Sequence, residues 1–268
     1  MRVNCVTKNA SSASSRDADS AQYGMNAIRQ SGAPRTAVIL AGGLGSRLRP
    51  YTVVLPKPLM PIGEMPILEV IIKQLARHGI TRIILAVNYQ ADILRAFFGN
   101  GERMGVEIAY SLETKPLGTM GPLRLMQALP DNFIVMNGDI LCDLDFGSFI
   151  DRHERENRLF TISASQREQL IDYGVLLSDG AGQLVGFSEK PRNSYLVSMG
   201  VYCVNRRVLE WIPEDQPFGF DQLMLKMIAD HHAVRIETHN GYWLDIGRPD
   251  DYHRAVEDWP KLKSSLGF

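Results

Sequence analysis

Cysteine is scarce in this sequence, since the 268 residues include only Cys5, Cys142 and Cys203, which lie far apart. No CxxC pair occurs, so neither a zinc site nor a disulfide framework is indicated, and a reducing cytoplasm is the predicted location. No apolar run reaches the ~18 residues that a membrane span requires. The net charge of −1 provides no basic field for nucleic acid, so a polyanionic ligand must be bound by local charges.

The first 34 residues differ from the rest of the chain. Residues 9–16 are small and polar, and the segment lacks the apolar stretch that defines a signal peptide. We predict a disordered tail over residues 1–34 and one folded domain over residues 35–268. Met25 is a candidate for the natural translation start, which N-terminal mass spectrometry of the native protein would test.

Strand-like and helix-like segments alternate from Thr36 onwards. This alternation predicts an α/β fold, with a doubly wound, mostly parallel (Rossmann-like) mixed sheet and helices on both faces. Ligands of such sheets bind at the carboxyl ends of strands, which is where Asp139 is placed. The expected strands cover residues 37–40, 82–87, 106–110 and 133–136, and the expected helices cover 66–79, 91–98 and 119–129.

The second half of the chain is less regular. We expect its strands to extend the sheet and to build a lid that faces the substrate. The expected strands cover residues 160–164, 174–177, 184–187 and 196–204, and the expected helices cover 221–229 and 249–259.

The glycine-rich segment Leu40-Ala-Gly-Gly-Leu-Gly-Ser-Arg-Leu-Arg-Pro50 directly follows the first expected strand. Glycines there allow backbone N–H groups to approach a phosphate, although many strand-to-helix turns carry glycine for steric reasons alone. The segment lacks the Gly-Lys-Ser/Thr of a Walker A loop, and Leu48 replaces the third glycine of a dinucleotide fingerprint. Arg47 and Lys57, the latter fixed between two prolines, supply cations suited to a triphosphate.

Further motifs follow this segment in a fixed order. They are Pro56-Lys-Pro-Leu-Met-Pro61, Leu117-Gly-Thr-Met-Gly-Pro122, Asn137-Gly-Asp139, Tyr173-Gly174, Glu189-Lys-Pro191 and Trp243-Leu-Asp-Ile-Gly247. Together the motifs resemble the signature of the sugar nucleotidyltransferase family, over about residues 36 to 258. The resemblance implies that residues 35–268 are a catalytic domain. This domain would transfer a nucleotidyl group from a nucleoside triphosphate to a sugar 1-phosphate and release pyrophosphate.

The resemblance also implies roles for the charged residues. Arg47 and Lys57 would bind the triphosphate, and Asp139 and Asp245 would hold Mg²⁺ between the α-phosphate and the sugar phosphate. On the residues alone, Asp139 could instead cap the turn at Asn-Gly-Asp. The implied catalytic residues are Arg47, Lys57, Asp139 and Lys190. The implied nucleotide-binding residues are Leu40, Ala41, Gly42, Gly43, Gly45, Ser46, Arg47, Lys57, Glu113, Gly118 and Asp139.

A second implied group would bind the sugar 1-phosphate. Lys190 would meet a phosphate, Glu189 would accept hydroxyl protons, and Gly174 would offer its backbone N–H. A surface salt bridge and a hairpin turn are the alternatives on residue type. Ser198 stands where relatives often carry asparagine, which leaves the identity of the sugar open. The implied sugar-binding residues are Gly138, Tyr173, Gly174, Glu189, Lys190, Ser198 and Gly200.

Glu113 bears on the nucleobase. Relatives that use thymidine or uridine tend to place an amide about five residues before the glycine that matches Gly118. Guanine presents two adjacent donors, which a carboxylate accepts, so Glu113 favours GTP unless it simply faces solvent. The surrounding residues resemble mannose-1-phosphate and heptose-1-phosphate guanylyltransferases.

Four functions are therefore weighed. The first is a magnesium-dependent guanylyltransferase acting on mannose 1-phosphate or a heptose 1-phosphate. The second is a uridylyl- or thymidylyltransferase for glucose 1-phosphate or an amino-sugar 1-phosphate. A silent nucleotide-sugar sensor is disfavoured because the charged set is present, and a nicotinamide-dependent oxidoreductase is disfavoured by the broken fingerprint. Any homodimer is expected to use the surface of the catalytic domain itself.

Overall fold

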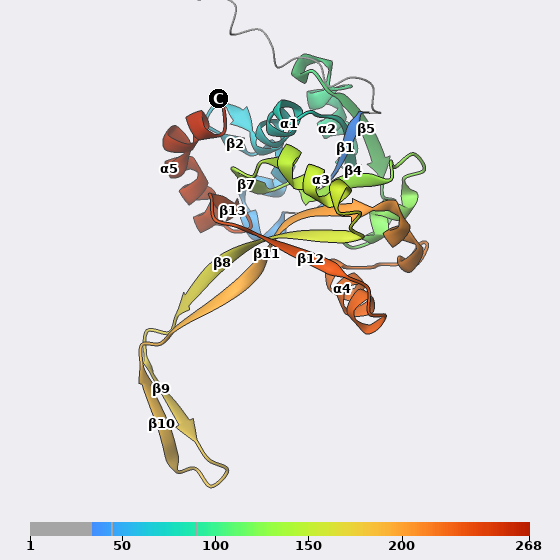
Figure 1. The fold of residues 1–268 in the computed structure, drawn as a ribbon. Helices are drawn as coiled ribbons and strands as arrows, with labels where there is room; N and C mark the ends of the chain where they lie inside the picture. The colour runs from blue at the N-terminus through green and yellow to red at the C-terminus, as the bar shows by residue number, and fades with distance from the viewer. Residues whose placement is uncertain (1–33, 44, 89) are drawn as a thin grey trace, which may run out of the picture. The chain divides into compact units, whose positions relative to one another are not determined.

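A computed structural model describes residues 34–43, 45–88 and 90–268, so Met25 and all of the predicted tail except Pro34 lie outside the described residues. Its main element is a seven-stranded sheet with the order β12-β8-β11-β6-β1-β4-β5 (Figure 1). The strands of this sheet are β1 (Arg35–Leu40), β4 (Ile80–Val87), β5 (Glu107–Leu112), β6 (Asn132–Asn137), β8 (Phe160–Leu170), β11 (Arg192–Asn205) and β12 (Val234–His239).

The pairing of these strands confirms the predicted mixed sheet. Strands β6, β1, β4 and β5 run parallel to one another, and β12 runs parallel to β8. Only β11 of the main sheet is antiparallel to its neighbours, β6 and β8. Because the central strands are parallel, their carboxyl ends meet at one edge, where the loop after Leu40 and the loop after Asn137 lie.

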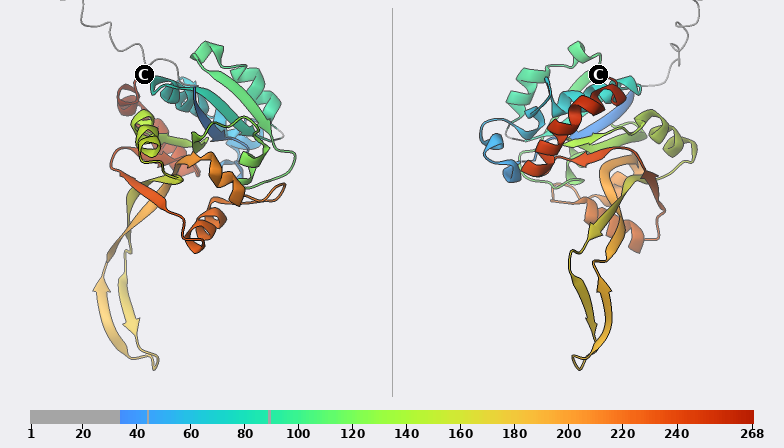
Figure 2. Two further views of the ribbon diagram at one scale, coloured as in Figure 1. Left: turned by 45° about the vertical axis from the view of Figure 1, so that its right-hand side comes forward. Right: turned by 90° about the vertical axis from the view of Figure 1, so that its left-hand side faces the viewer.

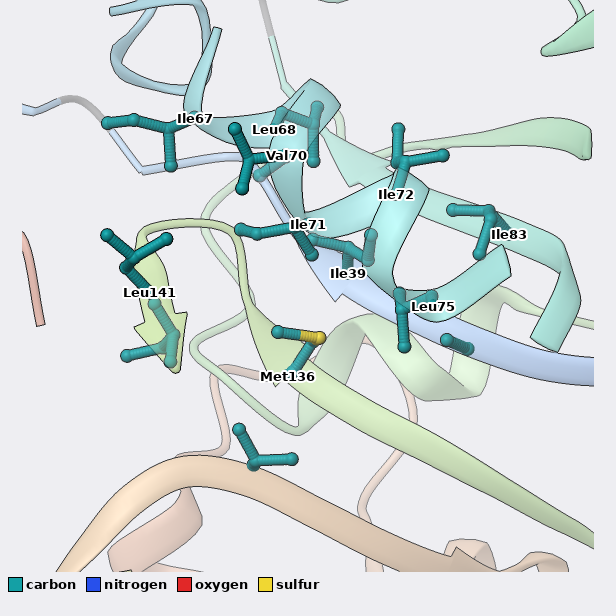
Figure 3. Packing of buried hydrophobic residues seen from close by; sticks show 14 of the residues in the cluster. Ile39, Ile67, Leu68, Val70, Ile71, Ile72, Leu75, Ile83, Met136 and Leu141 are labelled. Atoms are coloured by element: carbon teal, nitrogen blue, oxygen red, sulfur yellow. The ribbon is translucent and has the colours of Figure 1, made fainter. Parts of the chain in front are cut away.

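Helices pack on both faces of the sheet, as predicted. Alternate residues of β1 point to opposite faces, so Ala37 and Ile39 belong to one buried cluster and Val38 belongs to the other. Figure 3 shows the first cluster, in which Ile71 and Leu75 lie over Ile39. The helices of the first face are α1 (Ile67–Arg77), α2 (Ala91–Phe98), α3 (Phe146–Arg155) and α5 (Pro249–Ser265), and α4 (Phe220–Ala229) covers the second.

Two sequence expectations in this region differ from the structure. The helix expected over residues 119–129 is wrong, because only Gly121–Leu125 forms a 3₁₀ helix. Gly118 has φ +77, and the backbone N–H groups of Met120 and Gly121 donate to Phe218 O, so tertiary contacts replace helical bonds. Helix α3 was missed, although Asp145 caps it by accepting a bond of 2.9 Å from Ser148 N.

Three smaller two-stranded sheets complete the fold of the described residues. The strand pair β7 and β13 lies at the edge of the main sheet that carries the site. None of the helices in the described ranges combines the length and apolarity of a membrane span. The pairs are β2 (Pro61–Ile62) with β3 (Met65–Pro66), β7 (Ile140–Cys142) with β13 (Trp243–Asp245), and β9 (Gly174–Ser178) with β10 (Leu184–Glu189).

The outer halves of β8 and β11 continue beyond the sheet and lead to β9 and β10. Figure 1 and both views of Figure 2 show β9 and β10 standing away from the main sheet. We call residues 165–197, which form this extension, the arm. None of its residues is buried.

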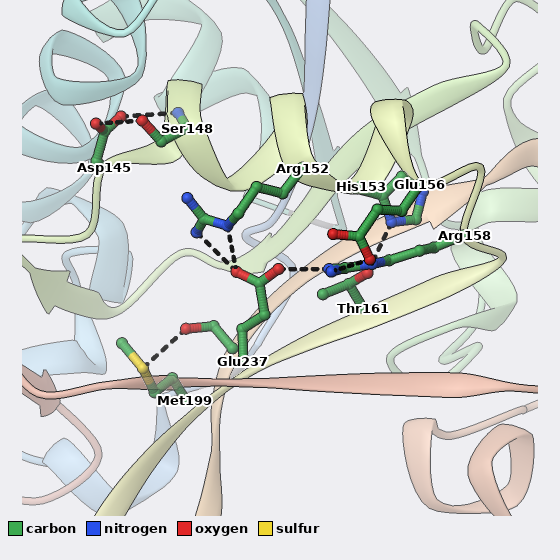
Figure 4. A network of polar contacts seen from close by, with 10 residues as sticks. Asp145, Ser148, Arg152, His153, Glu156, Arg158, Thr161, Met199 and Glu237 are labelled. Carbon is green, nitrogen blue, oxygen red and sulfur yellow. Dashed lines mark hydrogen bonds and ion pairs between the residues drawn. The ribbon is translucent and has the colours of Figure 1, made fainter.

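Ionic contacts connect α3 to β12 at the far edge of the sheet. Figure 4 shows Glu237 between Arg152 and Arg158. Arg152 donates to the Glu237 carboxylate at 2.9 Å and 2.7 Å, and Arg158 pairs with the same carboxylate. The two arginines lower the pKa of Glu237, which burial alone would raise.

His153 lies beneath this network, and its burial predicts how the stability of the fold changes in acid. Its ring is fully buried, its Nδ1 lies 2.8 Å from Thr161 Oγ1, and burial lowers its pKa from 6.5 to about 4. As the pH falls, His153 therefore becomes protonated near pH 6.5 in the unfolded chain but only near pH 4 in the folded chain. We expect the free energy of unfolding to fall by about 1.4 kcal/mol for each pH unit across this window, roughly 3 kcal/mol in total.

Denaturant titrations at several pH values between 7 and 4 would check this expectation. The matched variant is His153→Gln, which keeps a polar side chain but does not titrate. Its free energy of unfolding should decline less steeply with acid than that of the wild type. Parallel pH profiles for the two proteins would contradict the assignment.

Candidate active site

Two adjoining cavities open at the carboxyl ends of β1 and β6. The larger has a volume of about 820 Å³ and the smaller about 260 Å³. They share the residues Leu40, Gly43 and Asp139, so a single elongated ligand can occupy both. The strand ends thus position a two-part site at the edge of the sheet where parallel α/β folds bind ligands.

The smaller cavity is lined by the glycine-rich loop and by basic side chains. Thr52 Oγ1 donates a hydrogen bond of 2.6 Å to Gly45 O, which fixes the loop. Gly45 has φ +61, a conformation that favours glycine. The lining residues are Leu40, Ala41, Gly43, Gly45, Ser46, Arg47, Lys57, Pro58, Gly138, Asp139 and Gly247. Backbone N–H groups and two cations make this cavity suited to phosphates.

Two aspartates lie side by side at this cavity. Strand β13 pairs with β7 so that Asp245 lies opposite Ile140, and the Ile246 N–H donates to Asp139 O at 3.0 Å. This backbone pairing joins two segments that are separated by more than a hundred residues in the sequence. Lys57 Nζ forms an ion pair with Asp139 Oδ2.

The aspartate pair has the chemistry of a cation site. Within the described part of the chain, Asp139 Oδ1 and Asp245 Oδ1 are buried without a hydrogen-bond partner. Burial raises the pKa of Asp245, and the neighbouring Asp139 raises it further, against the opposing effect of Lys57 and Arg47. Among the described residues no third acidic, histidine or cysteine side chain completes a closed metal cluster. Two carboxylates with free oxygens next to a phosphate cavity fit Mg²⁺, which keeps part of its shell for phosphate and water.

Arg47 lies at the same point of the site. A Cβ atom built on Gly247 would lie 3.4 Å from Asp245 Oδ1 and 3.6 Å from Arg47 Nη2. The structure therefore brings together four residues from three separate segments of the chain, namely Arg47, Lys57, Asp139 and Asp245. Three of the four implied catalytic residues are in this group.

The larger cavity contains Glu113. Its carboxylate accepts a bond of 3.4 Å from the Leu117 N–H through Oε2, while Oε1 lies 3.2 Å from a Cβ built on Gly42. Burial raises the pKa of this carboxyl group. Glu113 is half-buried and lines the cavity, so the alternative that it faces open solvent is not supported.

Gly118 also lines the larger cavity and closes the loop that holds Glu113. Its φ is +77, and an added Cβ would lie 2.8 Å from Phe218 O, so only glycine fits. Asn88 and Asn137 line the cavity as well, although sequence reasoning did not select them. Their position at the carboxyl ends of strands could have identified them from the sequence. In the structure, Asn88 Nδ2 donates a hydrogen bond to Gly42 O. Of the remaining implied nucleotide-binding residues, all line one of the two cavities.

The residues implied for binding the sugar fall into two groups, three near the cavities and four on the arm. Gly138 lines the smaller cavity, and Gly200 lies against Asn137, where an added Cβ would be 2.6 Å from Asn137 Nδ2. Ser198 is close by, but its hydroxyl is engaged with Tyr202 OH and the Gly200 N–H, both at 3.2 Å. These three positions belong to the site end of β11 and β6.

The other four implied sugar residues, Tyr173, Gly174, Glu189 and Lys190, lie on the arm. Lys190 forms an ion pair of 2.9 Å with Asp172, which is also on the arm. None of the described residues that line the two cavities comes from the arm. The expectation of a lid over the substrate site is therefore wrong for a single chain in this conformation.

A family model described as "Nucleotidyl transferase" matches residues 36–261. The chain belongs to the nucleotidyl transferase family. It is 36% identical over 223 residues to "Mannose-1-phosphate guanylyltransferase catalytic subunit beta" of Drosophila pseudoobscura pseudoobscura, covering 81% of this chain and 60% of that protein. It is 32% identical over 243 residues to "UTP--glucose-1-phosphate uridylyltransferase" of Synechocystis sp., covering 82% of this chain and 62% of that protein.

This nucleotidyl transferase chain spans about three fifths of the length of those curated relatives. Among solved structures, the chain is similar to HddC from Yersinia pseudotuberculosis complexed with GMP-PN, and the match covers 99% of the HddC chain. That structure matches 84% of this chain with a TM-score of 0.63 and 28% sequence identity. The family model and the curated relatives confirm the family expected from the ordered motifs.

Proposed function

We propose that this nucleotidyl transferase transfers GMP from GTP to a sugar 1-phosphate of the mannose or heptose type, giving a nucleotide sugar and pyrophosphate. The observation that carries the proposal is the pair Asp139 and Asp245, whose buried free oxygens lie beside the phosphate cavity. The names of the matched relatives, which include a guanylyltransferase and a uridylyltransferase, support this class of reaction.

In the proposed reaction a sugar-phosphate oxygen attacks the α-phosphorus of the triphosphate. A new P–O bond forms, and the bond from the α-phosphorus to the bridging oxygen of pyrophosphate breaks. Mg²⁺ held by Asp139 and Asp245 would supply positive charge to the reacting phosphates. Arg47 and Lys57 line the smaller cavity, where they would neutralise the triphosphate and the departing pyrophosphate.

The base would occupy the larger cavity. The Glu113 carboxylate can accept hydrogen bonds from N1–H and N2–H₂ of guanine, whereas uracil and thymine offer a single ring donor. The complex of HddC with GMP-PN supports a guanine nucleotide for a structurally similar protein.

A substitution at Glu113 tests the base assignment. Glu113→Gln should lower kcat/KM for GTP by about 10- to 100-fold, because a hydrogen bond to a charged group contributes roughly 1.5–3 kcal/mol. Turnover of UTP or dTTP should stay unchanged or rise. Glu107→Gln, at the exposed first position of β5, the strand that Glu113 follows, is the matched control and should leave the preference for GTP intact. Equal losses with all nucleotides would remove Glu113 from base recognition.

A uridylyl- or thymidylyltransferase for glucose 1-phosphate or an amino-sugar 1-phosphate is the second candidate, and the Synechocystis relative favours it. A pyrophosphate-release screen with GTP, UTP, dTTP and CTP against a panel of sugar 1-phosphates separates the two. A clear preference for a pyrimidine nucleotide would overturn the guanylyltransferase proposal.

A further inference from the structure

The arm exposes an unusual amount of apolar surface. Two-stranded ribbons are at best marginally stable in water, so a ribbon with apolar side chains on both faces needs a partner surface. Together these side chains present on the order of the ~800 Å² that each partner buries in a standard stable interface. The nine large exposed apolar residues of the arm are Leu170, Tyr173, Leu176, Leu177, Leu184, Val185, Phe187, Tyr195 and Leu196, with exposed fractions between 49% and 78%.

The base of the arm is fixed to the body of its own chain. Strands β8 and β11 pair in register from Ser198–Ala164 outwards to Arg192–Leu170. At that base the Arg167 guanidinium lies 4.9 Å from the centre of the Trp243 ring, and the Trp243 indole N–H donates to Met199 O at 3.0 Å. The register of β8 with β11 shifts between Ser198 and Tyr202, where Gly200 has φ +74, so β11 bends at the root of the arm and the arm leaves this bend as a paired ribbon.

Two backbone bonds bridge the ladder of β8 and β11 to the separate ladder of β9 and β10. Beyond Arg192 the Ile171 N–H donates to Pro191 O at 3.1 Å, and the Lys190 N–H donates to Tyr173 O at 3.3 Å. The six steps from Ser198 to Arg192 span about 20 Å of extended strand, and Lys190 lies further out. In this structure the pairing from Ser198 to Arg192 and these two outer bonds hold Lys190 away from the site of its own chain.

The described residues that line the two cavities offer no free cation for the second substrate. A sugar 1-phosphate carries about −1.5 to −2 charges at neutral pH. Among the described residues lining the two cavities, the cations are Arg47 and Lys57 at the phosphate loop and Lys115, which is paired with Asp215 at 2.8 Å. The sugar phosphate therefore has no free basic partner from the body of its own chain in that lining.

A receiving surface for an apolar ribbon lies next to the smaller cavity. Tyr51, Val53, Val54 and Leu55 are 47%, 64%, 83% and 37% exposed. This loop patch, residues 51–55, directly precedes Lys57 and Pro58, which line the phosphate cavity. An apolar arm lying on the loop patch would bring the charges of the arm to the mouth of the site.

We propose that the arm acts in trans: in a two-fold dimer, the arm of each copy packs on the loop patch of the other and supplies Lys190 and Glu189 to the partner's sugar 1-phosphate. This inference rests on the proposed function. A two-fold arrangement buries both arms and both loop patches through the same contact made twice, and it leaves no open end for further association. Lys190 neutralises the sugar phosphate, and the Glu189 carboxylate accepts hydrogen bonds from sugar hydroxyl groups.

Subunit complementation tests the proposal. One chain carries Asp139→Asn, with an intact arm but a defective body, and the other carries Glu189→Gln with Lys190→Ala, with an intact body but a defective arm. Both chains are co-expressed with different tags and purified through both tags in turn. If the arm acts in trans, one of the two sites in each heterodimer combines an intact body with an intact arm. We expect about half the wild-type kcat/KM for the sugar phosphate, against a loss of at least about tenfold in either homodimer.

The control heterodimer pairs Asp139→Asn with Lys57→Ala, which places both defects in the body, and it should remain inactive. Failure to recover activity in the test heterodimer, or failure to obtain a heterodimer at all, overturns the inference. So does an arm variant with wild-type kcat/KM. Absence of nucleotidyl transfer by the wild type with every nucleotide and sugar phosphate would instead refute the proposed function, so the two failures are distinguishable.

The mass of the protein in solution gives an independent measurement. Light scattering should report twice the mass of the chain for the wild type. Val54→Asp on the loop patch should shift the protein to the monomer and raise KM for the sugar phosphate at least tenfold. Ile93→Asp, at an exposed apolar position of α2, is the matched control and should leave both the dimer and KM unchanged. A monomeric wild type would also overturn the inference.

Discussion

Asp139→Asn is expected to lower kcat by about 10³-fold with the sheet intact, because it removes one of two carboxylates proposed to hold Mg²⁺. The amide is neutral and of the same shape, so the backbone bond from Ile246 N to Asp139 O at 3.0 Å is kept. The variant also leaves Lys57 without its charged partner. Steady-state pyrophosphate release measures the loss, and removal of divalent cations by EDTA should abolish the wild-type activity.

The matched control for this substitution is Asp143→Asn. Asp143 lies just beyond β7 and pairs with His239 at 2.7 Å, and it is not among the residues lining either cavity. Its kcat should stay within about twofold of the wild type. Binding of Mn²⁺ in the presence of nucleotide, followed by electron paramagnetic resonance, should weaken in the Asp139 variant alone. Near-normal turnover or unchanged Mn²⁺ binding there would remove Asp139 from the metal site.

Lys57→Ala is the second substitution with a large expected effect. Lys57 lies between Pro56 and Pro58, is mostly buried, and contacts Asp139 at the phosphate cavity. We expect kcat/KM for the triphosphate to fall by about 10²- to 10³-fold, because a positioned cation near the leaving phosphates is lost. The loss should appear in kcat as well as in KM, since the charge on pyrophosphate grows as the bond breaks.

Lys73→Ala serves as the control for Lys57, because Lys73 is on the outer surface of α1 in an ion pair of 2.7 Å with Glu69. Its kinetic constants should match those of the wild type. Lys57→Arg should recover part of the activity if charge alone is needed. A Lys57→Ala enzyme with unchanged kcat and a raised KM would assign the residue to ground-state binding only.

The sequence by itself determined the class of the fold and the parts of the site that lie near one another in the chain. Short apolar runs such as residues 37–40 and 133–136 must be buried, and their alternation with amphipathic helices leaves few arrangements other than a parallel sheet. The glycine-rich loop and the ordered motifs then identified the family, which the family model and the relatives confirm. These inferences succeeded because they depend on periodicity and local backbone chemistry.

Sequence reasoning failed where tertiary contacts outweighed local preference. The segment after Gly118 was expected to be helical, but its N–H groups bond to Phe218 O, a partner about a hundred residues away. No periodicity reveals such a contact in advance.

Only the tertiary structure decided which of the implied site residues meet. Pairing of β13 with β7 unites Asp245 with Asp139, and the turn at Gly118 directs Glu113 into the larger cavity. The same structure separates Lys190 from them, because the continuous pairing of β8 with β11 carries the arm away from the cavities. The order of the motifs along the chain indicates which kind of reaction the residues can perform. It does not indicate which of these residues lie close together, because that depends on strand pairing between remote segments.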